Sequence, residues 1–140
     1  MLFNNKLGVN RGKSAIYNSS SFLNDKSVNS KVRLLQYAID KNLKFDFYNE
    51  VELPGKSRPE KKLLLQKLRT QEYSMVVVFK LNCWARSSKE LILELKEILD
   101  NGIQFVSISE NKVFSAKIEE HQYKILDVFA EFELSLISQR

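Results

Sequence analysis

The sequence has little cysteine or histidine and no long apolar run. Cys83 is the single cysteine, which excludes an internal disulfide framework and suits a reducing cytoplasm. No apolar stretch approaches the length that crosses a membrane, and the amino terminus shows no signal-peptide pattern. The one histidine, His121, lies far from Cys83 along the chain, so a thiol catalyst is not expected. We therefore expect a cytoplasmic protein without a membrane partner.

Positive charge is in modest excess, and the charged residues are scattered along the chain. The formal net charge of +5 favours a polyanionic partner only weakly. Apolar residues make up 44% of the sequence, and 140 residues are enough for one globular domain with a real core. Residues 1–12 are polar, asparagine-rich and without period. We expect them to be a flexible extension, followed by a single domain over 13–140.

A valine-rich run followed by an amphipathic stretch forms the centre of the chain. The run over 73–81 is typical of a strand buried on both faces. Residues 87–101 have one apolar helical face, and Ser87 and Glu90 have the spacing of a capping box. Arg86 stands in the turn between strand and helix, where open α/β sheets bind ligands and a helix amino terminus attracts anions. A phosphate ligand is one interpretation of Arg86, and a surface cation is the other.

Strand and helix patterns alternate through the rest of the chain. Further strands are expected at 14–17, which runs into a polar loop, and at 45–48 and 104–108. One helix is expected to bury Val32, Leu35 and Ile39, with Leu34 and Ala38 widening the stripe. Another opens at 57–60, again with capping-box spacing, and directs three leucines inward, Leu64, Leu65 and Leu68. This alternation predicts an α/β fold with a mostly parallel sheet of four to five strands and helices on both faces.

A long helix is expected from about Ser115 to the end of the chain. Its apolar residues form a seam and continue onto other sides; they are Ile125, Phe129, Phe132 and Leu136, then Leu126, Val128, Leu134 and Ile137. A helix that is apolar nearly all round is usually covered on more than one side. The favoured second cover is another subunit, and the alternative is that the helix packs only across its own sheet.

Three blocks of sequence follow one another in a recognisable order. They are Gly55 to Glu60 (GKSRPE), Val76 to Ser87 (VVVFKLNCWARS) and Ala130 to Arg140 (AEFELSLISQR). The first resembles a glycine loop followed by arginine-proline, the second a strand, turn and helix start, and the third an Ala-Glu-(Phe/Leu)-Glu-Arg stretch. Together they resemble the catalytic domain of serine site-specific recombinases, the resolvases and DNA invertases. The resemblance runs from about Lys13 to Arg140.

This resemblance implies a resolvase-like fold and a chemistry without metal or cofactor. In that chemistry a serine hydroxyl attacks a DNA phosphodiester, which leaves a 5′-phosphoserine link and a free 3′ hydroxyl, and arginines stabilise the phosphate charge. The implied partners are double-stranded DNA and further copies of the chain, as a homodimer and, in an active synapse, a tetramer. The long helix would then be the dimerisation helix. We expect the domain to end within that helix, without the DNA-binding domain that normally follows it.

The implied nucleophile lies in a run of serines. Tyr17 and Ser21 match the family's Tyr-x-Arg-x-Ser, which implies that Ser21 is the nucleophile and that Tyr17 belongs to the catalytic site. Because Ser19, Ser20 and Ser21 are adjacent, the register is open among the three. The plain alternative is that Ser21 is one hydroxyl of a serine-rich polar loop.

The other implied site residues come from the three blocks. Arg58 and Arg86 match active-site arginines, Asn82 stands where the family has an acid, and Glu133 and Arg140 match residues of the long helix. The resemblance implies catalytic roles for the first four. It implies contact with DNA for Arg58, Arg86 and Arg140.

Three family arginines are replaced in this chain. Ser19, Cys83 and Leu134 occupy their positions, and none of these side chains can place a positive charge on a phosphate. Cys83 is interpreted as a neutral replacement, and its neighbour Trp84 as a packing residue. The sequence therefore predicts a recombinase domain with impaired activity. The alternative is a non-catalytic dimerisation or DNA-architecture module that keeps the fold.

Overall fold

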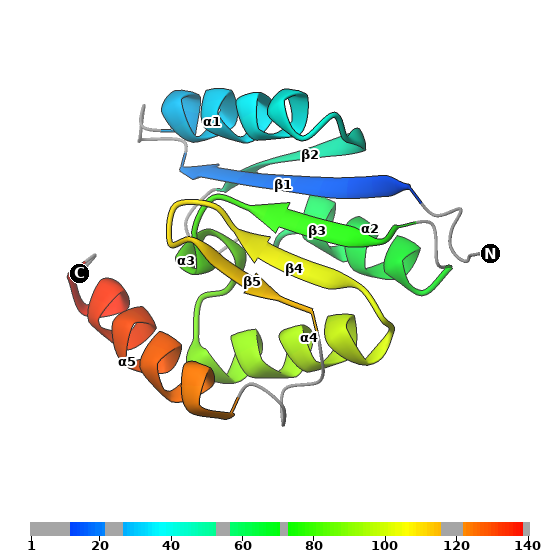
Figure 1. Cartoon of the computed structure of the whole chain (residues 1–140). Helices are drawn as coiled ribbons and strands as arrows, with labels where there is room; N and C mark the ends of the chain where they lie inside the picture. Colours follow the sequence, from blue (N-terminus) through cyan, green and yellow to red (C-terminus); the bar gives the residue numbers. More distant parts are fainter. Residues whose placement is uncertain (1–11, 22–26, 53–56, 71–72, 116–121, 139–140) are drawn as a thin grey trace.

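A five-stranded sheet runs through the middle of the computed structural model, which describes residues 12–21, 27–52, 57–70, 73–115 and 122–138 (Figure 1). The strands are β1 (Lys13–Ser21), β2 (Lys44–Glu52), β3 (Met75–Val78), β4 (Gln104–Ser107) and β5 (Lys112–Phe114). Their order across the sheet is β2-β1-β3-β4-β5. The first four are parallel and β5 is antiparallel to β4. The predicted mostly parallel α/β architecture is confirmed.

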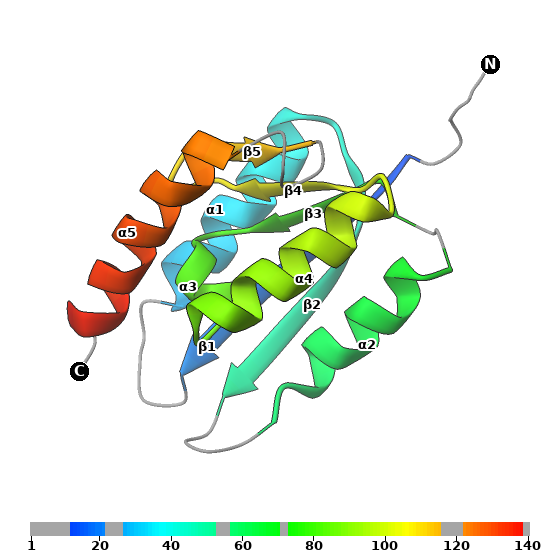
Figure 2. The ribbon, with the colours of Figure 1, turned by 90° about the horizontal axis from the view of Figure 1, so that it is seen from below.

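Helices cover both faces of this sheet. They are α1 (Ser27–Asp40), α2 (Pro59–Leu68), the short α3 (Leu81–Trp84), α4 (Ser88–Asp100) and α5 (Gln122–Ser138). One face carries α1, and the opposite face carries α2 and α4 (Figures 1 and 2). Side chains of β1 alternate between the two, since Ile16 packs in the cluster with α1 while Ala15 and Tyr17 pack in the larger cluster on the other face.

The polar end of β1 continues as a strand beyond the predicted residue 17. Asn18 to Ser21 pair with Asn49 to Glu52 of β2. The pairing of β1 with β3 stops earlier, at Tyr17 and Val78, so β1 and β2 reach past their neighbours at the carboxyl edge of the sheet. Parallel pairing satisfies the backbone of this segment, which a reading of side-chain hydrophobicity alone assigned to a loop.

The predicted buried face of α1 is confirmed at Leu34 and Ala38 and wrong at Val32 and Ile39. Val32 and Ile39 are 57% and 69% exposed, whereas Leu34 and Ala38 are completely buried. The buried stripe is continued by Ser30, whose hydroxyl donates to Oδ1 of Asn18 on β1 over 2.8 Å. A buried amide on the strand needs a polar partner, and this requirement turns α1 so that positions 30, 34 and 38 face the sheet.

The predicted start of the long helix, at about Ser115, borders residues 116–121, which lie outside the described residues. Before it, the chain makes a turn at Asn111, where φ is +54°, and returns as β5 with Phe114 paired to Phe105 of β4. The terminal helix α5 spans 17 residues from Gln122. Val128 and Phe132 of α5 are buried in the core that α2 and α4 share, so one side of this helix packs on its own domain.

Candidate active site

Three connections meet at the carboxyl edge of the sheet. β1 ends there at Ser21, β2 leads to Arg58 at the start of α2, and β3 leads through α3 to Arg86 before α4. Because these strands are parallel, their carboxyl ends lie at the same edge (Figure 1). The side chains of Ser20 and Ser21 lie outside the described residues, although Ser21 has a register position opposite Glu52.

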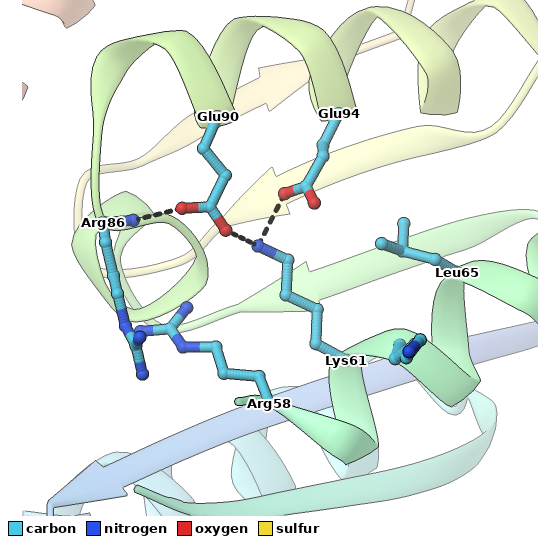
Figure 3. A pocket seen from close by; sticks show the side chains of 7 residues that line it. Arg58, Lys61, Leu65, Arg86, Glu90 and Glu94 are labelled. Carbon is cyan, nitrogen blue, oxygen red and sulfur yellow. Dashed lines mark hydrogen bonds and ion pairs between the residues drawn. The ribbon is translucent and has the colours of Figure 1, made fainter. Parts of the chain in front are cut away.

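A hollow of about 280 Å³ lies beside this edge, between α2 and the start of α4. Its lining consists of one leucine and six charged residues: Arg58, Lys61, Lys62, Leu65, Arg86, Glu90 and Glu94. Figure 3 shows the side chains of Arg58 and Arg86 running toward the same part of the hollow. Two of the predicted site residues are therefore brought together, from segments that are 28 positions apart in the sequence.

Arg58 is held at the start of α2 and reaches across to α3. It is the residue before the first turn, with Pro59 beginning the helix. Its Nη1 donates to the carbonyl oxygen of Trp84, the last residue of α3. Arg58 as a whole is half-buried, and it lines the hollow while one of its nitrogens is anchored to α3.

Arg86 is exposed and stands immediately before α4. The Ser87 half of the predicted capping box is confirmed, since the Ser87 hydroxyl accepts from the Glu90 N–H over 3.1 Å. Glu90 in turn accepts from the backbone N–H of Arg86 over 2.9 Å. The capping carboxylate thereby fixes the backbone that carries the Arg86 side chain.

Lys61 is the buried residue at the centre of the hollow. It is only 3% exposed, and its Nζ lies 2.5 Å from a carboxylate oxygen of both Glu90 and Glu94 (Figure 3). The same ammonium donates to the Trp84 carbonyl over 2.7 Å and lies 4.6 Å from the centre of the Trp84 ring. Sequence reasoning missed Lys61. A signal was present, because it precedes Leu64, Leu65 and Leu68 on the apolar stripe of α2.

The two carboxylates around Lys61 have pKa values shifted in opposite directions. Burial works against ionisation of both groups. For Glu90, the hydrogen bonds from Lys61 and from the Arg86 N–H outweigh burial and lower its pKa. For Glu94, burial outweighs the attraction of Lys61 and raises its pKa. The ammonium and the backbone amide therefore define Glu90 as the more strongly held anion.

Tyr17 lies beneath this site and outside its lining. Its ring is fully buried and packs edge-on against Trp84, with the ring centres 5.2 Å apart. Its hydroxyl donates to Oε1 of Glu50 over 3.0 Å. Tyr17, which the sequence predicted to belong to the catalytic site, is therefore placed where it supports α3 from the sheet.

Glu50 caps α2, and the predicted capping box of that helix is wrong. The carboxylate of Glu50 accepts from the backbone N–H of Glu60 over 3.2 Å and from that of Lys61 over 3.0 Å. Ser57 lies before the cap position, which Arg58 occupies. The spacing of Ser57 and Glu60 predicted a cap from within the helix start. In the structure, the acceptor for the Glu60 and Lys61 amides is instead the Glu50 carboxylate of β2.

The predicted site residues Asn82 and Glu133, and the replacement Cys83, lie where α3 and α4 meet α5. Asn82 donates through Nδ2 to the Ser135 hydroxyl over 3.3 Å, and the Cys83 thiol lies 3.7 Å from Oδ1 of Asn82. Burial raises the pKa of Cys83. Glu133 accepts a hydrogen bond from the Ser88 hydroxyl and so joins α5 to the first turn of α4. These contacts join α3 and α4 to α5 beside the hollow. Arg140 lies outside the described residues.

Over the described ranges, no group of three or more His, Cys, Asp or Glu side chains is placed to hold a metal ion. None of the described helices combines the length and apolar character of a membrane span.

The fold and the hollow define an α/β domain with cationic side chains at the carboxyl edge of its sheet. Residues 18–140 match the family model of the resolvase N-terminal domain. This chain therefore belongs to the resolvase family, and the resemblance drawn from its three sequence blocks is confirmed.

Individual relatives agree with this assignment. The chain is 32% identical over 108 residues to the Tn917 transposon resolvase of Enterococcus faecalis. This match covers 76% of this chain and 55% of that protein. The chain thus spans about half the length of this relative. It matches the N-terminal catalytic domain of the TP901-1 integrase with a TM-score of 0.69 and 26% identity, over 89% of this chain and 98% of that one.

A second solved structure supports the fold alone. A resolvase-family site-specific recombinase from Streptococcus pneumoniae matches with a TM-score of 0.66 and 16% identity, over 91% of this chain and 90% of that chain.

Proposed function

We propose that this domain is the DNA-cleaving domain of a site-specific recombinase. In the proposed reaction the Ser21 hydroxyl attacks a DNA phosphodiester, its oxygen becomes bonded to the 5′ phosphate, and the 3′ oxygen leaves as a hydroxyl. The proton lost by the serine balances the one gained by the leaving oxygen. The observation that carries the proposal is that Arg58 and Arg86 line one hollow at the edge where β1 ends at Ser21.

Two guanidiniums in one hollow suit a phosphodiester for physical reasons. Each planar fork can bond two phosphate oxygens and keeps its charge at any physiological pH. Negative charge accumulates on the phosphate during serine attack, and donors already in position stabilise it without reorganising. Neither the binding of the phosphate nor the stabilisation of its charge requires a metal or an organic cofactor.

We expect this activity to be impaired. Ser19, Cys83 and Leu134 occupy positions where the family has arginine. One charge-assisted hydrogen bond contributes roughly 1.5–3 kcal/mol, and about 1.4 kcal/mol changes a rate tenfold. If the three losses were independent, they would slow cleavage by at least about three powers of ten, although groups that act as a unit are not additive. Asn82 can still donate a hydrogen bond, but it cannot hold a neighbouring arginine by charge.

The proposed partners follow from this function. Double-stranded DNA is the substrate, with Arg58, Arg86 and Arg140 in contact with its phosphates. The chain acts as a homodimer and, during strand exchange, as a tetramer in the cytoplasm. What supports self-association is α5, on which Leu134 and Ile137 remain 66% and 57% exposed.

Covalent capture on DNA tests the proposal. The domain would be fused to a DNA-binding domain of known site, and its protein–DNA product trapped and measured. The parent would be compared with Ser21→Ala and with the reversion Ser19→Arg/Asn82→Asp/Cys83→Arg. Single Ser19→Ala and Ser20→Ala variants test the other two serine registers. We expect slow cleavage by the parent that requires Ser21 and is accelerated by the reversion. Rapid Ser21-dependent cleavage by the parent would contradict the impairment.

A non-catalytic dimerisation or DNA-architecture module is the second candidate. What favours it is that Asn82 and Cys83 bond to each other and Asn82 to Ser135 of α5, so the turn before Arg86 is built into the helix packing. If neither the parent nor the reversion forms a covalent product while both still self-associate, this candidate is the better description.

A further inference from the structure

The hollow contains a buried ion cluster that phosphate binding does not explain. Lys61 is 3% exposed, lies 2.5 Å from both Glu90 and Glu94, and is drawn between them in Figure 3. A buried ion pair seldom stabilises a fold more than a well-packed apolar pair of the same size, because both charges lose their hydration. The fold alone therefore gives little reason for charge at this place.

The contacts of Lys61 lead to both arginines. Its Nζ donates to the Trp84 carbonyl over 2.7 Å, and Nη1 of Arg58 donates to the same oxygen. It also donates to Oε2 of Glu90, whose other oxygen accepts from the Arg86 N–H. One ammonium thus connects the α2 start, the end of α3 and the turn before α4.

The charge of Lys61 has a second consequence. Glu90 and Glu94 line the same hollow as Arg58 and Arg86. Without a buried cation between them, these carboxylates would be attracted to the nearest guanidiniums and would compete with a phosphate for them. Lys61 offsets one of their two negative charges from the interior, and Arg58, Lys62 and Arg86 make the lining of the hollow cationic as a whole.

We propose that Lys61 is a positioning residue, which holds the Trp84–Arg86 turn and restrains Glu90 and Glu94 so that Arg58 and Arg86 bind one phosphate together. This inference rests on the proposed function for its ligand, a phosphodiester. It adds the residue that determines the geometry of the two arginines. Lys61 itself does not touch the reacting atoms.

Three variants of the chain distinguish a positioning role of Lys61 from the effect of losing one positive charge and from a loss of folding. Lys61→Met removes the ammonium and keeps the length of the side chain. Lys61→Met/Glu94→Met replaces the ion pair by an apolar pair and so removes the uncompensated buried charge. Lys62→Met is the matched control, because Lys62 also lines the hollow but is exposed. Urea unfolding would establish that each variant is folded.

Two NMR measurements give the answer. The first is hydrogen exchange of the Arg86 backbone amide, which needs no ligand. The second is a titration with inorganic phosphate, followed on the Nε–Hε signals of Arg58 and Arg86. In the parent we expect both arginines to respond with one common dissociation constant.

We expect both Lys61 variants to exchange the Arg86 amide about tenfold faster and to bind phosphate about tenfold more weakly, the effect of losing one charge-assisted hydrogen bond. Their two arginine signals should no longer share one constant. Lys62→Met should weaken phosphate binding only about threefold by lost charge and leave the Arg86 amide unchanged. Parental Arg86 exchange in the double variant, or equal losses in Lys62→Met, would overturn the inference. If the parent itself shows no phosphate response, the proposed function loses its support, and Arg86 exchange still decides the role of Lys61.

Discussion

Glu50 shows how much one buried carboxylate can hold in this domain. It is 2% exposed and accepts from the Tyr17 hydroxyl and from the backbone N–H groups of Glu60 and Lys61. A negative charge at the start of α2 also interacts favourably with the helix dipole. The residue that caps this helix is therefore the one that also positions Tyr17 under Trp84.

Replacing Glu50 by alanine should destabilise the domain. The change leaves the Tyr17 hydroxyl and two amides without their acceptor, and one buried unsatisfied donor costs roughly 1–3 kcal/mol. We expect the free energy of unfolding to fall by about 3 kcal/mol in urea titrations followed by circular dichroism. Glu131→Ala, at an exposed position of α5, is the control and should change it little. A loss below about 1 kcal/mol for Glu50→Ala would contradict a capping role.

Cys83 gives a pH-dependent test at the same scale. Burial disfavours its thiolate and raises the pKa of Cys83 above the ordinary thiol value. Since only the thiolate is alkylated, the pH at which iodoacetamide reacts at half its maximal rate should be higher in the folded protein than in urea. Mass spectrometry of the alkylated chain measures both profiles. A folded midpoint at or below the unfolded one would refute the assigned burial.

The two helix starts that line the hollow are stabilised in different ways. α4 is capped from its own sequence by Ser87, whereas α2 is capped by Glu50 from a strand. A local cap survives wherever the segment is placed, but a cap from a strand exists only when β2 and α2 have packed. The spacing of Ser57 and Glu60 therefore correctly predicted a helix start, but the acceptor of the Glu60 N–H is Glu50 and not Ser57.

A pair of serine variants tests this difference between elements. Ser87→Ala removes the acceptor of the Glu90 N–H and should cost about 1 kcal/mol, the usual value of an N-cap. Ser57→Ala should leave stability nearly unchanged, because Glu50 already accepts from the Glu60 amide. Both would be measured by the same urea titrations. Equal costs for the two serines would show that α2 is capped locally after all.

At the scale of the whole molecule, α5 has one side buried in the core and another side exposed to solvent. Val128 and Phe132 are 2% and 1% exposed, while Leu134 and Ile137 on the other side remain largely exposed. Each large apolar side chain left in water forgoes about 1.5–3 kcal/mol of burial. This outer side is the surface on which we expect a second copy to pack.

Aspartate substitutions on that exposed side should weaken self-association without destabilising the fold. Leu134→Asp/Ile137→Asp is expected to lower the mass measured by light scattering across concentration and to leave the unfolding free energy nearly unchanged. Val32→Asp/Ile39→Asp, on the exposed side of α1, is the matched control and should leave the mass unchanged. Phe132→Asp should instead unfold the domain, because that ring is buried within the single chain. A parent that is monomeric at all concentrations would refute the association.

The sequence by itself determined the central unit of this protein. The strand at 75–78, the α4 helix with its Ser87 cap, and the position of Arg86 between them depend on neighbours within a few residues. Local patterns determine such features, because the hydrophobic period and the capping geometry are properties of one short segment. Each of the three resolvase blocks was visible for the same reason, since each is a short continuous segment.

Only the tertiary structure decided the face of α1, the cap of α2 and the surroundings of Lys61. Each depends on a buried polar group that must find a partner from a distant segment: Asn18 finds Ser30, the α2 amides find Glu50, and Lys61 finds Glu90 and Glu94. Leaving such a group unpaired costs more than a misplaced apolar contact at a half-exposed position, so these pairings override the hydrophobic period. The partners lie 10 or more positions apart and on different elements, so the period of a single helix contains no sign of them. The period therefore predicted Val32 and Ile39 inward and gave no role to Lys61.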